Sequence, residues 1–218
     1  MAGTRKPVAV LVSGNGTNLQ ALIDAAKVDS YPARIAVVIS NVAGVRALQR
    51  AADAGIPTVT IPHGDYPDRA LFEQALLDAM APHGVEIVCL AGFMRVLTRR
   101  FLRDFPGPVL NVHPALLPAF PGLHAVRQAL DYGAKLTGCT VHFVDEGTDT
   151  GPVVAQVAVP VLDSDDEAAL SARIQAQEHW VYPLALRLVA EGRAMTNGRR
   201  VWSGGGPRTE GLSIRNPG

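Results

Sequence analysis

The sequence predicts an α/β protein with a mainly parallel sheet, helices on both faces and antiparallel additions toward the C-terminus. Short apolar, β-branched runs alternate with amphipathic stretches over the first half of the chain, which is typical of parallel sheets covered on both sides. From about Thr137 two extended runs follow each other with only a turn between them. The 218 residues, 48% of them hydrophobic, can bury a full core without metals or disulfides.

Each element is predicted from its own pattern. We expect five buried strands at Val8–Val12, Ile35–Ile39, Thr58–Ile61, Ile87–Leu90 and Val109–Val112. Two helices are expected from apolar residues at helical spacing, one with Leu19, Leu22, Ile23 and Ala26, the other with Leu71, Ala75, Leu76 and Ala79. The antiparallel additions are expected at Gly138–Val144 and Val153–Val161.

The C-terminal part is expected to hold one long helix and a tail. The helix should begin near Asp165 and Asp166, whose carboxylates suit a helix N-terminus, and Pro183 should kink it. From residue 203 to residue 218 glycine and proline are frequent and apolar residues are few. We therefore predict a single domain over residues 1–202 and a flexible tail over 203–218.

The charge balance and the N-terminus limit the functions to consider. Twenty Lys and Arg residues balance twenty Asp and Glu residues, so the chain lacks the positive field that a nucleic-acid partner requires. The apolar run Val8–Val12 is too short for a signal sequence or a membrane span. Cys89 and Cys139 lie far apart in apolar surroundings, which fits buried thiols in a reducing compartment. We expect a cytoplasmic protein that binds no membrane.

The loop after the first strand is a candidate anion site. It reads Ser13-Gly14-Asn15-Gly16-Thr17-Asn18 and leads directly into a helix, whose first backbone N–H groups lack partners. The third glycine of a dinucleotide motif and the GK[ST] of a nucleotide triphosphate loop are both absent. An ordinary tight turn explains these residues equally well, so both interpretations stand at this point.

Asn111 and His113 are candidates for chemistry. They stand two apart at the end of an expected central strand, so both side chains should point to one face at the carboxyl edge of the sheet. An amide and a protonated imidazole can both donate to a developing oxyanion. Asp149, in a glycine-flanked turn, could keep the imidazole charged and accept a proton. A hydrogen-bonded strand end and a turn-forming aspartate are the simpler alternatives.

The remaining histidines form no metal-ligand spacing. His63, His83 and His124 are expected in loops or helix starts, while His142 either lines the site or packs in the core. Ser13 and Ser164 lack the G-x-S-x-G context of a hydrolase nucleophile. We therefore expect neither a catalytic metal nor a serine hydrolase.

Four motifs in one order resemble a known family. They are Ser13-Gly14-Asn15-Gly16-Thr17-Asn18-Leu19-Gln20, Leu90-Ala91-Gly92-Phe93-Met94-Arg95, Asn111-Val112-His113-Pro114-Ala115-Leu116-Leu117-Pro118 and Asp149-Thr150-Gly151-Pro152. Together they resemble the phosphoribosylglycinamide formyltransferases, folate-dependent enzymes of purine biosynthesis, over nearly all of residues 7–190. The resemblance implies a Rossmann-like formyltransferase fold. It also implies an enzyme that moves a one-carbon formyl group. Both a monomer and a homodimer stay open as the oligomeric state.

The resemblance implies where two small-molecule substrates bind. The donor, 10-formyltetrahydrofolate, is a reduced folate that would contact Arg69, Met94, Arg95, Val96, Leu97, Asn111, Asp145, Glu146, Gly147, Thr148 and Asp149. The acceptor, glycinamide ribonucleotide, would contact Gly16, Thr17, Asn18, Gln175, Ala176, Gln177 and Glu178. Asn111, His113 and Asp149 would be catalytic, and no metal takes part. Thr17 replaces the serine that is common in relatives and keeps the hydroxyl.

Three rival functions remain to be distinguished. A methionyl-tRNA formyltransferase should be longer and carry a basic RNA-binding domain, which this neutral chain lacks. A formyltetrahydrofolate hydrolase should carry an N-terminal regulatory domain, whereas the first strand is expected already at Val8. A non-catalytic nucleotide-binding module would bind the nucleotide and turn over no folate. The sequence indicates no role for the stretch after Arg200.

Overall fold

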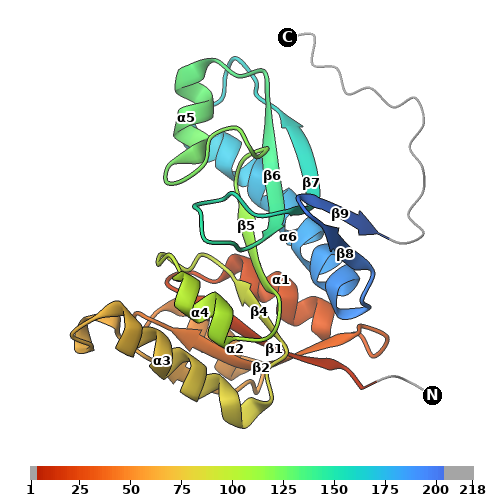
Figure 1. Cartoon of the computed structure of the whole chain (residues 1–218). Coiled ribbons are helices and arrows are strands. Elements are labelled where there is room, and N and C mark those ends of the chain that lie inside the picture. The colour runs from red at the N-terminus through yellow and green to blue at the C-terminus, as the bar shows by residue number, and fades with distance from the viewer. Residues whose placement is uncertain (1–3, 204–218) are drawn as a thin grey trace.

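The computed structural model describes residues 4–203 and confirms the predicted fold class. A seven-stranded sheet has the strand order β3-β2-β1-β4-β5-β6-β7, and a separate hairpin is formed by β8 and β9. Its strands are β1 (Lys6–Val12), β2 (Ala33–Ser40), β3 (Thr58–Thr60), β4 (Ile87–Leu90), β5 (Val109–His113), β6 (Leu136–Phe143), β7 (Val153–Pro160), β8 (Ala194–Asn197) and β9 (Arg200–Ser203). Figure 1 shows β6 and β7 extending beyond the parallel part of the sheet.

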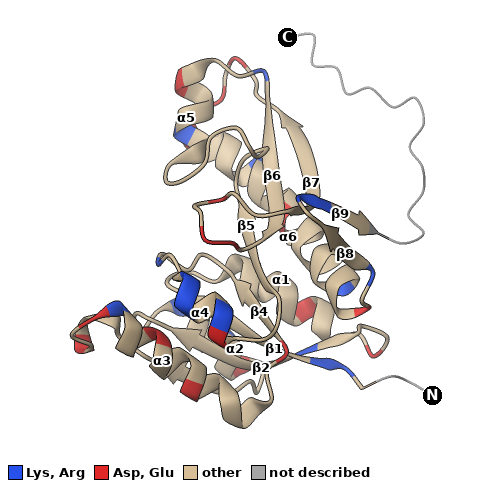
Figure 2. Ribbon diagram, in the orientation of Figure 1, with Lys and Arg blue, Asp and Glu red and all other residues tan. Residues whose placement is uncertain are grey.

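Between residues 4 and 203, six α-helices and two short 3₁₀ turns connect these strands. The helices are α1 (Thr17–Ala26), α2 (Arg46–Asp53), α3 (Arg69–Met80), α4 (Arg99–Asp104), α5 (Ala125–Tyr132) and α6 (Glu167–Ala190), and the turns are η1 (His63–Asp65) and η2 (Ala81–His83). Among the described residues no helix is both long enough and apolar enough to cross a membrane. In Figure 2 the loop between β6 and β7 is coloured for acidic residues along part of its length, and α4 is coloured mainly for basic residues.

The strand order places a topological switch point between β1 and β4. Strands β1 to β5 run parallel, whereas β6 and β7 are antiparallel to their neighbours. From β1 the chain proceeds outward through β2 and β3, then returns to the other side of β1 for β4 and β5. The carboxyl ends of β1 and β4 therefore face a topological switch point, where ligands bind in sheets of this kind.

Alternation along β1 divides the core between the two faces of the sheet. Val8, Val10 and Val12 join one apolar cluster with residues of α1, α2 and α6. Ala9 and Leu11 join a second cluster with residues of α3 and α4. Because both sets are fully buried, β1 is a central strand covered on both sides.

The capping residue of α6 is as expected, whereas the buried face of α3 differs from the prediction. Asp166 caps α6 by accepting a hydrogen bond from the Ala169 N–H at 2.7 Å, which confirms the expected start. The buried face expected for α3 is wrong at Leu71, which is 50% exposed. The buried side of α3 instead centres on Phe72, Leu76 and Met80, because the larger aromatic side chain turns that face toward the sheet.

The C-terminal part contains one element that no sequence pattern indicated. The single long helix is observed as α6, which includes Pro183 and ends at Ala190, and the kink at Pro183 stays a prediction. The hairpin of β8 and β9 follows it, and its last residue, Ser203, is the first residue of the predicted tail. Residues 204–218 lie outside the described residues.

Candidate functional site

Strands β5 and β6 place three polar side chains together at the edge of the sheet. Asn111 and His113 lie two residues apart on β5, and His142 of β6 is the direct partner of Asn111 in the antiparallel pair. His113 and His142 are buried, with 5% and 2% of their surface exposed. The Asn111 Nδ2 lies 3.3 Å from His142 Nε2. The expected shared face of Asn111 and His113 is thus observed.

The loop between β6 and β7 brings Asp149 onto this face. Asp149 has a φ of +55°, in the left-handed region that aspartate tolerates better than most residues. A Cβ on Gly151 would lie 1.7 Å from the carbonyl oxygen of Phe143, so only glycine permits the close return of the loop. The Asp145 carboxylate accepts from the Gly147 N–H at 3.1 Å and from the Thr150 hydroxyl at 2.6 Å. These contacts close the loop over the site.

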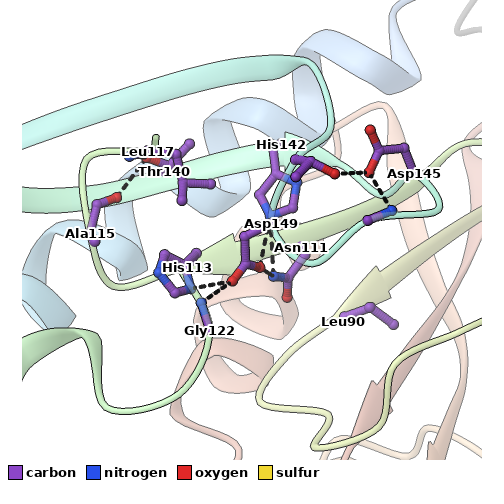
Figure 3. A network of polar contacts seen from close by, with 12 residues as sticks. Leu90, Asn111, His113, Ala115, Leu117, Gly122, Thr140, His142, Asp145 and Asp149 are labelled. Carbon is purple, nitrogen blue, oxygen red and sulfur yellow. Dashed lines mark hydrogen bonds and ion pairs between the residues drawn. The ribbon is translucent and has the colours of Figure 1, made fainter. Parts of the chain in front are cut away.

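Asp149 is the centre of the polar cluster (Figure 3). Its Oδ2 accepts from the Gly122 N–H at 2.8 Å and lies 3.2 Å from His113 Nδ1. Its Oδ1 lies 3.5 Å from the Asn111 Nδ2 and 3.6 Å from His142 Nε2. The structure therefore brings Asn111, His113 and Asp149 together, with His142 as a fourth member.

The hydrogen-bond partners favour a charged His113 beside a charged Asp149. The Phe120 carbonyl, 2.8 Å from His113 Nε2, can only accept, so the Nε2 must carry a hydrogen. Burial alone would raise the pKa of Asp149, but hydrogen bonds from His142 and Gly122 and the charges of both histidines hold that pKa below its usual value. With Asp149 ionised, His113 Nδ1 also faces an acceptor, and both ring nitrogens are donors in the imidazolium form.

The loop after β1 is shaped by close packing. Gly16 has a φ of +70°, and a Cβ there would lie 2.6 Å from the Cβ of Ala47 on α2. α1 begins at Thr17 without a side-chain cap, so the first-turn N–H groups are not satisfied by the residue that precedes them. The loop can therefore receive an anion at the helix N-terminus.

The long helix α6 supplies the other side of this loop. Glu178 accepts from the Asn18 amide at 2.9 Å, and the Gln175 amide donates to the Thr17 hydroxyl at 3.1 Å. Burial raises the pKa of Glu178, and the hydrogen bond from Asn18 opposes that shift. The buried Oδ1 of Asn18 has no hydrogen-bond partner among the described residues, which fits a position where a ligand hydroxyl donates. Gln175 and Ala176 are exposed.

The segment after β4 lies beside the loop after β1. The Met94 N–H donates to the Ser13 hydroxyl at 2.9 Å, and this hydroxyl donates to Asn41 at 2.5 Å. Met94 and Val96 are 65% and 51% exposed and offer an apolar surface, whereas Leu97 is buried in the core. Any ligand that runs along this segment would therefore meet the backbone of Leu97 instead of its side chain.

The other residues predicted to contact the folate are mostly exposed. Arg69 is the first residue of α3 and is exposed, and Arg95 is partly buried. Glu146 forms an exposed ion pair with Arg99 of α4 at 2.8 Å, which joins the loop between β6 and β7 to the segment after β4. Thr148 is exposed. Apart from Arg69 on α3 and Asn111 on β5, the residues predicted to contact the folate thus lie in the segment after β4 and in the loop between β6 and β7.

Two backbone groups of the site were not indicated by the sequence. The Phe120 carbonyl and the Gly122 N–H come from the loop after β5 and bind His113 and Asp149. Thr140 supports this loop by donating to the Ala115 carbonyl at 2.6 Å and accepting from the Leu117 N–H at 3.0 Å. Backbone partners depend on the path of a loop, so residue types alone gave no signal for them. Within residues 4–203 no group of three His, Cys, Asp or Glu residues is arranged to hold a metal ion.

Known proteins provide an independent comparison. The family model described as formyl transferase matches residues 6–186. A trifunctional purine biosynthetic protein of Drosophila pseudoobscura pseudoobscura is 53% identical over 190 residues, which are 86% of this chain and 14% of that protein. A phosphoribosylglycinamide formyltransferase of Mycobacterium tuberculosis is 47% identical over 203 residues, 90% of this chain and 94% of that protein.

The solved structures agree with this assignment. The crystal structure of glycinamide ribonucleotide transformylase 1 from Symbiobacterium toebii superimposes with a TM-score of 0.90 at 49% sequence identity, and the match covers 92% of this chain and 95% of that one. The chain spans only about a seventh of the trifunctional insect relatives but nearly the whole of the shorter bacterial ones. This chain belongs to the formyl transferase family.

Proposed function

We propose that the chain transfers the formyl group of 10-formyltetrahydrofolate to the amine of glycinamide ribonucleotide, a step of de novo purine biosynthesis. The observation that carries this proposal is the cluster of Asn111, His113 and Asp149 between two candidate substrate surfaces. Two relatives whose own sequences are covered almost completely by the match are named phosphoribosylglycinamide formyltransferase. The enzyme would act in the cytoplasm, as a monomer or a homodimer.

The acceptor would bind between the loop after β1 and α6. Its phosphate would lie on Gly16, Thr17 and Asn18, where the N-terminus of α1 offers N–H groups. Its ribose and amine would extend along the segment Gln175-Ala176-Gln177-Glu178. Asn18 already joins the two elements through its hydrogen bond to Glu178, and its free Oδ1 could accept from a ribose hydroxyl.

The folate donor would bind on the opposite side of the reaction cluster. The exposed Met94 and Val96 provide an apolar wall, and the backbone of the segment provides hydrogen-bonding groups for a flat heterocycle. The loop Asp145–Asp149 would form the other wall, held near this segment by the Arg99–Glu146 ion pair. The formyl group would then face Asn111 and His113.

The reaction would be a direct transfer without a covalent enzyme intermediate. The neutral amine of the acceptor attacks the formyl carbon, a C–N bond forms, and the carbonyl electrons move to the oxygen. Asn111 and the imidazolium of His113 stabilise this oxyanion. The proton lost by the amine passes to Asp149 directly or through water, and the bond to the folate nitrogen breaks as that nitrogen takes up a proton. Alignment of two bound substrates would supply about 7 to 11 kcal/mol at best.

The geometry adds one requirement to this mechanism. Both N–H groups of the His113 imidazolium point at protein acceptors, Asp149 on one side and the Phe120 carbonyl on the other. A hydrogen bond from His113 to the oxyanion therefore needs Nε2 to exchange the Phe120 carbonyl for the substrate. Such rearrangements accompany substrate binding in many enzymes, because catalytic hydrogen bonds tighten only in the loaded complex.

A spectrophotometric assay for deformylated folate tests the proposal. Purified protein is mixed with 10-formyltetrahydrofolate, with and without glycinamide ribonucleotide. Absorbance change that depends on the acceptor supports the transferase. Formate release without an acceptor would identify a formyltetrahydrofolate hydrolase, and a protein that binds the nucleotide but turns over no folate would be a binding module.

A further inference from the structure

The hairpin of β8 and β9 lies beyond the part of the chain that matches the formyl transferase family. The family match ends at residue 186, and the hairpin occupies residues 194–203. A two-residue turn, Gly198-Arg199, joins its strands, and the φ of +59° at Gly198 suits the tight turns that hairpins use. Figure 1 shows the hairpin beside β7, and β9 packs against that strand. The turn therefore reaches toward the beginning of β7.

Arg199 connects this turn to the loop that carries Asp149. The Arg199 Nη2 donates a hydrogen bond of 2.8 Å to the Thr150 carbonyl. Thr150 directly follows Asp149 in the chain, and its hydroxyl donates to the Asp145 carboxylate at 2.6 Å. Thr150 is thus held from two sides, by its side chain within the loop and by its backbone from the hairpin.

The backbone of Asp149 needs such support. Its left-handed conformation, with a φ of +55°, costs about 1 kcal/mol or more relative to ordinary conformations. The surrounding contacts must hold it there, since a relaxed backbone would turn the carboxylate away from His113. Within residues 4–203 the Arg199 hydrogen bond links the hairpin to the peptide group between Thr150 and Gly151, one residue beyond Asp149.

We propose that Arg199 is a positioning residue that keeps the Asp149 carboxylate on His113 and on the Gly122 N–H. The catalytic part of this inference rests on the proposed function. Arg199 acts through the Thr150 carbonyl and does not touch the substrates. Its positive charge next to the acidic loop adds attraction, because Asp145, Glu146 and Asp149 lie within five residues of each other.

The experiment compares Arg199→Ala with Arg193→Ala in the full chain. Arg193 precedes β8 and pairs with Glu191 at 3.0 Å, so its removal alters the base of the same hairpin without touching Thr150. Amide hydrogen exchange is followed by NMR at Gly122, whose N–H binds Asp149, and at Gly147, whose N–H binds Asp145. A merely structural role of the hairpin would not alter protection at Gly122, because this residue belongs to the loop after β5.

We expect exchange at Gly122 to become about tenfold faster in Arg199→Ala and to stay unchanged in Arg193→Ala. Turnover should fall about three- to tenfold in Arg199→Ala with an unchanged KM for the acceptor, and the acidic limb of its pH profile should move to higher pH. Arg199→Lys, which keeps a donor and the charge, should recover most of the loss.

Two results would overturn the inference. One is equal Gly122 protection in Arg199→Ala and wild type. The other is loss of activity without recovery in Arg199→Lys while the loop stays protected. The exchange measurement needs no substrate, so it distinguishes failure of this inference from failure of the proposed function. If wild type shows no formyl transfer but Arg199→Ala still loses Gly122 protection, the positioning role holds and the assigned reaction is wrong.

Discussion

The two loops that form the candidate site are built by different forces. The loop over residues 13–18 is fixed by packing, since Gly16 lies against Ala47 with no room for a Cβ. The loop over residues 144–152 also needs the small Gly151 beside Phe143, but its carboxylates are placed by polar contacts of Asp145, Asp149 and Thr150. The first loop should therefore respond to changes of volume, and the position of Asp149 to changes of charge and pH.

The difference suits the tasks that we propose for the two loops. A phosphate group keeps its charge and shape through the reaction, so a rigid packed loop can hold it throughout. The proton of the attacking amine must move, and a carboxylate in a hydrogen-bonded loop can accept it with small rearrangements. Five substitutions, two of them with matched controls, test this contrast.

The largest effect is expected at the reaction cluster. His113→Ala and Asp149→Ala should each lower kcat by about 1000-fold or more, because a charged donor or its counter-ion is lost from the transition state. Folate binding, measured by fluorescence quenching or calorimetry, should remain measurable in both. Wild-type turnover in either variant would remove that residue from the mechanism. Folding of both variants is checked by thermal denaturation.

A volume change should damage the first loop. Gly16→Ala places a methyl group 2.6 Å from the Cβ of Ala47 and forces alanine to a φ of +70°. Gly44→Ala is a matched control, because Gly44 has a φ of +68° but no atom within 4 Å of its would-be Cβ. The control should lose about 1 to 2 kcal/mol of stability from backbone strain. Gly16→Ala should lose about 1 to 3 kcal/mol more, from overpacking.

The same pair separates binding from stability. Gly16→Ala should raise the KM for glycinamide ribonucleotide about tenfold or more, because the N-terminus of α1 must shift, while Gly44→Ala leaves it near wild type. Equal losses of stability in the two variants would show that packing does not fix the first loop.

A pH change should act on the second loop. Because the pKa of Asp149 is lowered in the fold, its ionised form stabilises the native state above the unfolded pKa of about 3.9. This stabilisation is lost as the pH falls through the lowered folded pKa. In urea denaturation at pH 7, the free energy of unfolding of Asp149→Asn should therefore be lower than that of wild type. This difference in free energy should disappear in strongly acidic solution. A difference that persists unchanged there would mean that Asp149 stabilises the loop by shape and not by charge.

The smallest effect on stability is expected at Glu178. Burial raises the pKa of this carboxyl, so the ionised form costs stability as the pH rises through the raised value. Glu178→Gln keeps an acceptor for Asn18 and should be at least as stable as wild type at pH 7, while the KM for the acceptor rises. Glu191→Gln, on the surface beside Arg193, is the control. A clear loss of stability at Glu178 alone would contradict the assigned pKa direction.

The sequence predicted the parts of the fold that depend on local patterns. All seven strands of the main sheet lie where the sequence patterns indicated, because buried strands need continuous β-branched residues and their ends are marked by polar turns. The burial expected at Thr58–Ile61 is wrong for Thr58 and Thr60, which are exposed because β3 is an edge strand. The start of α6 followed from Asp166 for a similarly local reason. The closeness of Asn111 and His113 followed from the period of a strand.

The remaining features depend on contacts between distant segments. Glu178 looks like a solvated helix residue in the sequence, yet it is 7% exposed because α6 packs on α1 beside Asn18. The apolar residues of β8 and β9 stand in adjacent pairs and do not alternate with polar ones, so no strand pattern marked the hairpin. The contact between Arg199 and Thr150 spans 49 residues. The backbone groups of Phe120 and Gly122 carry no signal in residue type at all.

Isotope tracing tests the central claim most directly. The donor carries a ¹³C formyl group, the acceptor carries a ¹⁵N amine, and the products are followed by NMR and by mass spectrometry of the protein. Direct transfer predicts a formyl carbon signal split by coupling to ¹⁵N, which appears without free formate and without formylated protein. Labelled formate as the main product, or a formyl group attached to the enzyme during turnover, would contradict it.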